Sequence, residues 1–237
     1  IEDDVLAVIT DPSEFGSTLE KVETAIRLIP GYAERFEKAF GTPEVTAERI
    51  ARAIAQFVRT LVSSNSRFDH YLRGEVQLTQ SELKGFVLFT TEEGADCFHC
   101  HGAAANPLFT TNLFYNNGKD SMFTDPFDRY SVTGDPMDKG AYKASTLRNI
   151  EFTAPYMHDG RFETLEEVIA FYAHGLVWTP YINPLMHHIV NGGNQLTPAE
   201  KVNLIAFLKT LSDTSFLHNP EFGQPEAFPD EMLEENE

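Results

Sequence analysis

The sequence predicts a mainly α-helical fold, and three observations support this. Ser or Thr followed three residues later by Glu, the capping-box pattern of a helix start, occurs at Ser17, Thr79, Thr164 and Thr197. Apolar residues after these starts recur with the i, i+3, i+4 spacing of one helix face. No segment shows the sustained alternation of apolar and polar residues that is typical of a strand.

Three helices are expected in the first sixty residues. The first follows Ser17 and ends at Pro30-Gly31, and the second covers about 32–40 and stops at Gly41. The third begins near Thr46, and its apolar positions follow the helical rule: Ile50, Ala53, Ile54, Phe57, Val58 and Leu61. These apolar residues are expected to pack inward.

A polar connection over 63–78 suggests a domain boundary, placed after residue 75. Further helices are expected after Thr79, Thr164 and Thr197, the last with Pro at its first position. Residues 102–147 lack a periodic pattern and are rich in Asn, Gly, Asp and aromatic residues. So long an irregular stretch is unusual inside a compact domain unless it wraps something large. The resulting division is 1–75, 76–213 and an acidic, Pro-containing tail over 214–237.

The charge balance excludes several classes of protein. The chain has 237 residues, with 36 Asp or Glu against 18 Lys or Arg, and a formal net charge of −18. Nucleic-acid binding requires clustered basic residues, so no nucleic-acid partner is expected. No apolar run reaches the length needed for a membrane span, and the acidic residues after Ile1 do not resemble a signal peptide. The 19 Phe and 8 Tyr supply enough apolar surface for a folded core.

Both cysteines of the chain lie in one pentapeptide, Cys97–His101, which reads C-x-x-C-H. This is the attachment signature of c-type haem. Two thiols at this spacing reach the two vinyl groups along one haem edge, and the following His101 ligates the iron. Cys97 and Cys100 are therefore the expected covalent attachment points, and His101 the expected proximal ligand.

Closely spaced cysteines also occur in zinc sites and in thioredoxin-type redox pairs. A zinc site needs two further ligands, usually a second close pair, and His187-His188 is a poor substitute. A thioredoxin-type redox pair needs a βαβ context, which the sequence does not show. A haem also accounts for the irregular stretch, because the macrocycle must be enclosed by apolar side chains. The order helix, haem motif, wrapping loop, distal ligand and closing helix predicts a cytochrome c-like haem domain.

The second axial ligand of the iron is left open by composition. A Met ligand would raise the reduction potential, whereas an anionic Tyr would lower it. The downstream candidates are Met122, Met137, Met157, His158, Tyr172, His174, Met186, His187 and His188.

Long motifs in the second half of the chain resemble the bacterial dihaem cytochrome c peroxidase and MauG family. The stretches 146–150 (TLRNI), 153–162 (TAPYMHDGRF) and 164–168 (TLEEV) are similar to its C-terminal haem domain. The closing run 205–211 and the N-terminal run from Ile29 to Phe40 are also similar. The resemblance covers nearly the whole chain, and the motifs keep their order.

The resemblance implies two haems of type c in the complete protein. An N-terminal peroxidatic haem would react with hydrogen peroxide, and a C-terminal haem would pass electrons to it. The motif at Cys97, Cys100 and His101 matches the C-terminal haem. Residues 1–75 are then expected to be a truncated part of the peroxidatic domain, and 76–213 the C-terminal cytochrome domain.

The resemblance also assigns individual residues. Glu14 matches an acidic residue over the peroxidatic haem that assists proton movement, although an acid there also suits a helix start. The carbonyl groups of Thr153 and Pro155 match ligands of a structural calcium ion. Tyr172 stands where classical members place an axial Met, which resembles the MauG-type branch with His–Tyr ligation.

The implied activity is reduction of hydrogen peroxide to water with electrons from a small cytochrome or copper protein. The alternatives are a MauG-type oxidase of a protein side chain and a monohaem electron carrier. An acidic surface would favour encounter with a basic donor. Haem attachment implies the bacterial periplasm, and the family implies a homodimer.

Overall fold

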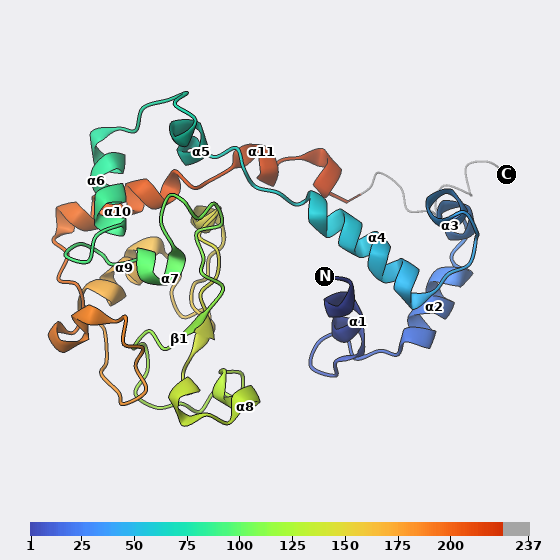
Figure 1. Ribbon diagram of the computed structural model, residues 1–237, viewed down its shortest axis with the longest axis horizontal. Helices are drawn as coiled ribbons and strands as arrows, with labels where there is room; N and C mark the ends of the chain where they lie inside the picture. The colour runs from blue at the N-terminus through green and yellow to red at the C-terminus, as the bar shows by residue number, and fades with distance from the viewer. Residues whose placement is uncertain (225–237) are drawn as a thin grey trace. The chain divides into compact units, whose positions relative to one another are not determined.

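The computed structural model describes residues 1–224, which form two compact units (Figure 1). The first unit contains Ile1–Val62 and the described residues from Ser215 onward, and the second contains Ser63–Thr214. Most of the expected acidic tail, residues 225–237, lies outside the described part of the chain.

The first unit contains four helices, α1 (Glu2–Thr10), α2 (Leu19–Leu28), α3 (Tyr32–Phe40) and α4 (Ala47–Thr60). Its small core consists of Phe36, Val45 and Ile50, with side chains of α2 and α3 around them. α1 packs on α4, and Arg59 of α4 pairs with Glu2 at 2.7 Å. The sequence did not predict α1, whereas α3 has the expected bounds.

Two expectations for the first unit need correction. The N-cap of α2 is Thr18, whose side chain accepts a hydrogen bond from the Lys21 amide, so the capping pattern at Ser17 is one residue early. The buried face of α4 consists of Ala47, Ile50, Ala51 and Ala55. Its larger residues Ile54, Phe57 and Val58 remain 40–47 % exposed instead of packing inward. Small alanines form the contact because they allow α1 and α2 to approach closely.

The second unit is also mainly helical, and the prediction of a mainly α fold is confirmed. Its helices are α5 (Arg67–Leu72), α6 (Gln80–Phe89), α7 (Phe98–His101), α8 (Tyr130–Thr133), α9 (Leu165–His174) and α10 (Pro198–Lys209). α11 (Thr214–Leu217) follows at the boundary between the units. Short 3₁₀ turns η1 (Pro136–Asp138), η2 (Ile150–Phe152) and η3 (His187–Asn191) interrupt the connections, and η4 (Pro220–Phe222) lies near the end of the described chain. The strands β1 (Phe114–Tyr115) and β2 (Tyr142–Lys143) form one short antiparallel pair.

Helix starts in the second unit follow the sequence closely. Complete capping boxes begin α6 at Thr79, α9 at Thr164 and α10 at Thr197, as expected. A fourth box, which the sequence analysis missed, begins α5 at Ser66 with Asp69 as its acidic partner. Each box satisfies amide groups that the first turn of a helix leaves unpaired.

α6 and α10 lie side by side and carry the core of the second unit (Figure 1). Gly85 is the point of closest approach, since a Cβ atom there would lie 1.9 Å from the carbonyl oxygen of Asn203. Around this contact four aromatic rings pack with centroid separations of 5.1–5.3 Å: Phe68, Phe86, Phe89 and Phe207. This core supports one side of the cavity described below.

The structure divides the chain at 62/63, earlier than the boundary placed after residue 75. Phe68 explains the difference, because α5 inserts this fully buried ring between Phe109 and Phe207. The segment 63–75, polar as it is, therefore packs with the second unit. Among residues 1–224, the helices are all too short or too polar to cross a bilayer.

Candidate haem site

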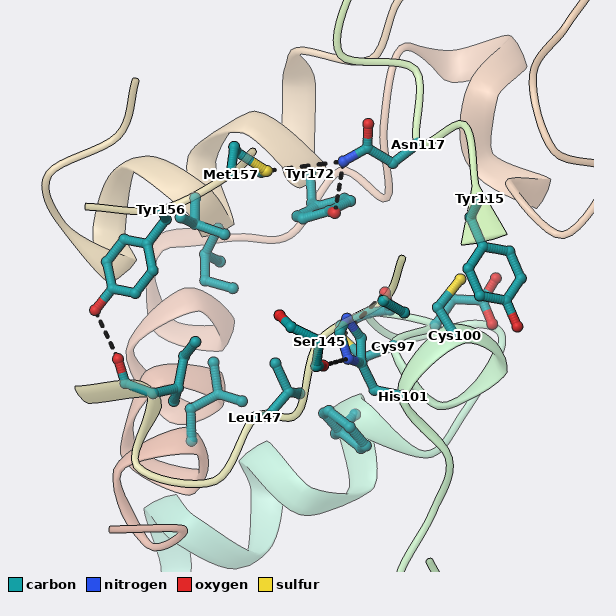
Figure 2. A pocket seen from close by; sticks show the side chains of 18 of the residues that line it. Cys97, Cys100, His101, Tyr115, Asn117, Ser145, Leu147, Tyr156, Met157 and Tyr172 are labelled. Carbon is teal, nitrogen blue, oxygen red and sulfur yellow. Dashed lines mark hydrogen bonds between the residues drawn. The ribbon is translucent and has the colours of Figure 1, made fainter. Parts of the chain in front are cut away.

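A cavity of about 610 Å³ lies in the second unit, and its lining includes Cys97, Cys100 and His101 of the haem motif. Its walls come from α7, the segment 142–158, α9 and the segment 185–188. Figure 2 shows the α7 residues on one side of an open space and Tyr172 on the other. The irregular stretch 102–147 contributes Tyr115, Asn117 and the residues after Tyr142 to this lining.

The two thiols are held in place by the short helix α7. Cys97 is its N-cap, and Gly102, with a φ of +72°, ends it directly after His101. Burial, with a smaller contribution from the charge of Asp96, raises the pKa of both thiols to about 12. Neither cysteine is in a disulfide, so both sulfurs are in the reduced form that attachment to vinyl groups requires.

The His101 imidazole is oriented by a backbone contact. Its Nδ1 lies 3.2 Å from the carbonyl oxygen of Ser145, to which it donates in the neutral tautomer. Burial lowers the pKa of His101, which favours the neutral ring. This tautomer leaves the lone pair on Nε2, the nitrogen available to a metal ion.

Tyr172 occupies the facing side of the cavity (Figure 2). Its phenolic oxygen accepts a hydrogen bond of 3.0 Å from the Nδ2 group of Asn117. Burial raises the pKa of Tyr172 to about 12, although the bond from Asn117 acts in the opposite direction. A metal ion would have to supply the charge needed to stabilise the phenolate in this site.

Met157 is a neighbour of Tyr172, because the same Asn117 amide reaches its sulfur at 3.8 Å (Figure 2). The Met157 thioether and the Tyr172 phenol thus lie close to the same Asn117 side-chain amide. Both lie on the side of the cavity that faces His101. His158 also lines the cavity, but its Nε2 pairs with Asp125 at 3.2 Å and its ring stacks on Tyr142 at 3.5 Å.

The other axial candidates divide by position. Met122 and Met137 are 77 % and 57 % exposed and do not line the cavity, and His174 is exposed at the end of α9. Met186, His187 and His188 do line it. Position alone, without the family resemblance, therefore reduces the candidates for the second axial ligand to those that line the cavity: Met157, His158, Tyr172, Met186, His187 and His188.

The cavity fits a c-type haem in size and chemistry. Its volume lies in the range of cofactor pockets, and most of its exposed lining is apolar. It brings together two thiols, one imidazole with a free nitrogen and, across from them, a phenol and a thioether. Such a set can attach the macrocycle covalently and complete both axial positions of iron.

The remaining residues assigned by resemblance lie in different places. Thr153 and Pro155 line the cavity wall, on the segment between η2 and α9. Glu14 is exposed in the turn between α1 and α2, where its amide donates to the Asp11 carbonyl at 3.1 Å. This turn belongs to the first unit, so the second-unit cavity does not include Glu14.

Arginine suits the carboxylates of haem propionates, but two arginines of the second unit already have carboxylate partners. Arg148 lines the cavity and forms a two-point ion pair with Asp69, at 2.8 and 2.9 Å. Arg161 pairs with Asp159 at 2.7 Å and with Asp120 at 2.8 Å. Both guanidinium groups therefore stabilise the protein scaffold.

Sequence reasoning missed Asn117 and Ser145 as contributors to the site. Asn117 lies in the polar run Asn116-Asn117-Gly118 of the irregular stretch, and Ser145 contributes through its backbone carbonyl. Neither carries a spacing signal, because each acts across 44 or more residues of sequence.

The fold and the cavity define a c-type haem protein. A family model described as di-haem cytochrome c peroxidase matches residues 1–77. A solved MauG-like protein associated with microbial copper homeostasis superposes with a TM-score of 0.80 at 34 % identity, covering 95 % of this chain and 72 % of that one. The chain therefore belongs to the dihaem cytochrome c peroxidase and MauG family, as the motifs had indicated.

Curated relatives include members of both branches. The cytochrome c551 peroxidase of Nitrosomonas europaea is 36 % identical over 86 % of this chain, and the methylamine utilization protein MauG of Methylorubrum extorquens is 33 % identical over 86 %. The chain spans 56 % and 55 % of the lengths of these two proteins. The family carries haem of type c.

Proposed function

We propose that the second unit is the electron-transfer haem domain of a dihaem enzyme that reduces hydrogen peroxide to water. The observation that carries this proposal is the cavity with Cys97, Cys100 and His101 on one side and Tyr172 on the other. A haem held there supplies a one-electron redox centre. Reduction of one peroxide consumes two electrons and two protons, and the electrons would come from a small cytochrome or copper protein.

In this proposal the chain's own groups hold and tune the centre. Cys97 and Cys100 would attach the macrocycle, and the Ser145 carbonyl orients the His101 ring so that its Nε2 is available to iron. Tyr172 would be the second protein ligand of the iron, and its hydrogen bond from Asn117 limits the movement of the phenol. Burial among apolar side chains excludes water, which strengthens the electrostatic control of the redox potential.

Tyr172 also supports a second candidate, a MauG-type oxidase that acts on a protein side chain. A phenolate ligand lowers the reduction potential, which disfavours acceptance of electrons from a mild donor. It also favours ferric and higher oxidation states of iron, which a MauG-type oxidase would use. The alternative of a monohaem carrier fits the chain by itself, because its two cysteines can attach one haem.

Further assignments belong to the complete enzyme. Glu14 would assist proton movement at a peroxidatic haem, and the carbonyl groups of Thr153 and Pro155 would bind a structural calcium ion. The expected second haem, the periplasmic location and a homodimer rest on family membership.

The experiment is a comparison of two activities in the complete protein that contains this chain, matured with its haems. Peroxide consumption is followed with a reduced small cytochrome as donor, and oxidation of a candidate partner protein is followed by mass spectrometry. The proposal expects donor-dependent peroxide turnover. Oxidation of the partner protein without donor-dependent peroxide turnover would favour the MauG-type alternative. Absence of both activities would favour the monohaem electron carrier.

A further inference from the structure

Beside the haem motif, the side chains of Glu92, His99 and His187 converge. One ligand atom from each lies within 4.8 Å of the other two. The three come from separate places: the turn after α6, the middle of α7 and the start of η3. Neither histidine has a part in the proposed axial ligation, and nothing in the haem chemistry requires this convergence.

Asp96 fixes the orientation of both imidazole rings. One of its carboxylate oxygens lies 2.5 Å from Nδ1 of His99, and the other lies 3.3 Å from Nδ1 of His187. The Asp96 side chain is only 6 % exposed, so its two oxygens have little access to water. A carboxylate on Nδ1 leaves the lone pair on Nε2 and increases its basicity, which is the arrangement found behind metal-bound histidines.

Glu92 supplies negative charge on the solvent-exposed side of the cluster. Oε1 of Glu92 lies 3.6 Å from Nε2 of His99, and the Glu92 side chain is 59 % exposed. His187 is 40 % exposed, so solvent and ions reach the cluster. Two carboxylates beside two imidazoles give a site that is negative when the rings are neutral, and this attracts a cation.

We infer that Glu92, His99 and His187 bind a divalent cation of the zinc class, with Asp96 orienting the two histidines. Nitrogen and carboxylate ligands suit zinc, whereas calcium and magnesium prefer oxygen alone. Ligands at about 2.0–2.1 Å from a tetrahedral ion lie about 3.4 Å apart, so ligand atoms that are up to 4.8 Å apart must approach by up to about 1.4 Å. The exposed side chains of Glu92 and His187 have the freedom to do so, and water completes the coordination.

This inference rests on four side chains and not on the proposed peroxidase activity. The haem-loaded chain, without an affinity tag, is titrated with zinc chloride in a calorimeter. We expect one zinc ion per chain, and affinity at least about tenfold weaker in His187→Ala and in Glu92→Gln. Calcium and magnesium chlorides should give no binding at the same concentrations.

Matched controls are available on the same chain. Glu93→Gln changes the adjacent exposed carboxylate and His218→Ala an exposed histidine elsewhere, so both should keep the wild-type affinity. Absence of zinc binding, or equal affinity in all four variants, would overturn the inference. Should a variant fail to mature, anomalous scattering at the zinc edge from wild-type crystals decides: a peak among Glu92, His99 and His187 supports the site, and peaks only elsewhere refute it.

Discussion

The side-chain amide nitrogen of Asn117, Nδ2, donates a hydrogen bond of 3.0 Å to the phenolic oxygen of Tyr172. The two residues lie 55 positions apart, one in the irregular stretch and one on α9. Burial raises the pKa of Tyr172 to about 12, and the Asn117 bond opposes this rise because it favours the ionised oxygen. Asn117 is therefore positioned to support a phenolate ligand.

Replacing Asn117 tests this relationship. In Asn117→Ala the haem-loaded ferric protein should need a higher pH to form the tyrosinate-ligated state, by up to about one pH unit for a hydrogen bond of about 1 kcal/mol. Asn117→Asp should shift the transition further, because a carboxylate repels the phenolate. The absorption spectrum, recorded as a function of pH, measures both shifts. An unchanged transition, or one moved to lower pH, would refute the role of Asn117.

The ion pair of Asp69 and Arg148 should make stability depend on pH in the acidic range. Burial opposes ionisation of Asp69, but hydrogen bonds from Arg148 and Ser66 lower its pKa to about 2. A lowered pKa stabilises the folded state above the ordinary value near 3.8, and this contribution disappears as the pH falls toward 2. The shift corresponds to about 2 kcal/mol.

We therefore expect Asp69→Asn to lower the free energy of unfolding by about 2–3 kcal/mol at neutral pH, since it leaves Arg148 buried without its partner. The difference from wild type should shrink between about pH 4 and pH 2, as urea unfolding at several pH values would show. Glu75→Gln is the matched control. Glu75 pairs with Arg73 on the surface, so its loss should change stability little. Equal effects of the two substitutions would contradict this account.

Gly85 should not tolerate a methyl group. Alanine is normally better than glycine in a helix by about 1 kcal/mol. At Gly85, however, the new Cβ would lie 1.9 Å from the Asn203 carbonyl oxygen and 2.7 Å from the Phe207 Cβ atom. Gly85→Ala should therefore destabilise the protein by about 1–3 kcal/mol, as overpacking does elsewhere.

Thermal unfolding compares this variant with Gly74→Ala, which has open space around the new atom but a φ of +75°. The control carries only the backbone cost of about 1 kcal/mol. Stabilisation by Gly85→Ala would show that α6 and α10 are not in close contact.

Removal of the haem should loosen the cavity walls selectively. In the double variant Cys97→Ser with Cys100→Ser the haem cannot be attached covalently. The apolar side chains of the cavity lining then have no macrocycle to pack against. Hydrogen exchange followed by mass spectrometry should then increase over 102–147 and 176–194, which carry few regular hydrogen bonds. Exchange in α4 should stay the same, because that helix belongs to the first unit. Uniform loss of protection in both units would contradict a local role for the haem.

The sequence predicted a helix correctly where the helix begins with a capping box, because that pattern lies within four consecutive residues. Thr79, Thr164 and Thr197 each begin a helix because side chain and amide groups only three residues apart satisfy one another. The same reasoning failed at Ser17, where neighbouring Thr18 can cap equally well and does. It missed α1, which has no side-chain cap.

Of the haem site, the sequence predicted only the residues whose spacing along the chain is fixed by covalent attachment of the haem. Cys97, Cys100 and His101 follow from the haem's own dimensions, so the motif identified them. Asn117, Ser145 and the partner of Arg148 depend on contacts across 44 to 79 residues, which no local pattern encodes. The choice between Tyr172 and Met157 also came from a resemblance, since both lie near the same amide.

The central claim is that the iron of a haem bound at Cys97 and Cys100 lies between His101 and Tyr172. The most direct measurement is the absorption and resonance Raman spectrum of the ferric haem-loaded protein, compared with Tyr172→Phe and Met157→Leu. We predict tyrosinate–iron bands in the wild type and in Met157→Leu, and their loss in Tyr172→Phe. An unchanged spectrum in Tyr172→Phe, with a thioether–iron charge-transfer band that disappears in Met157→Leu, would contradict the claim.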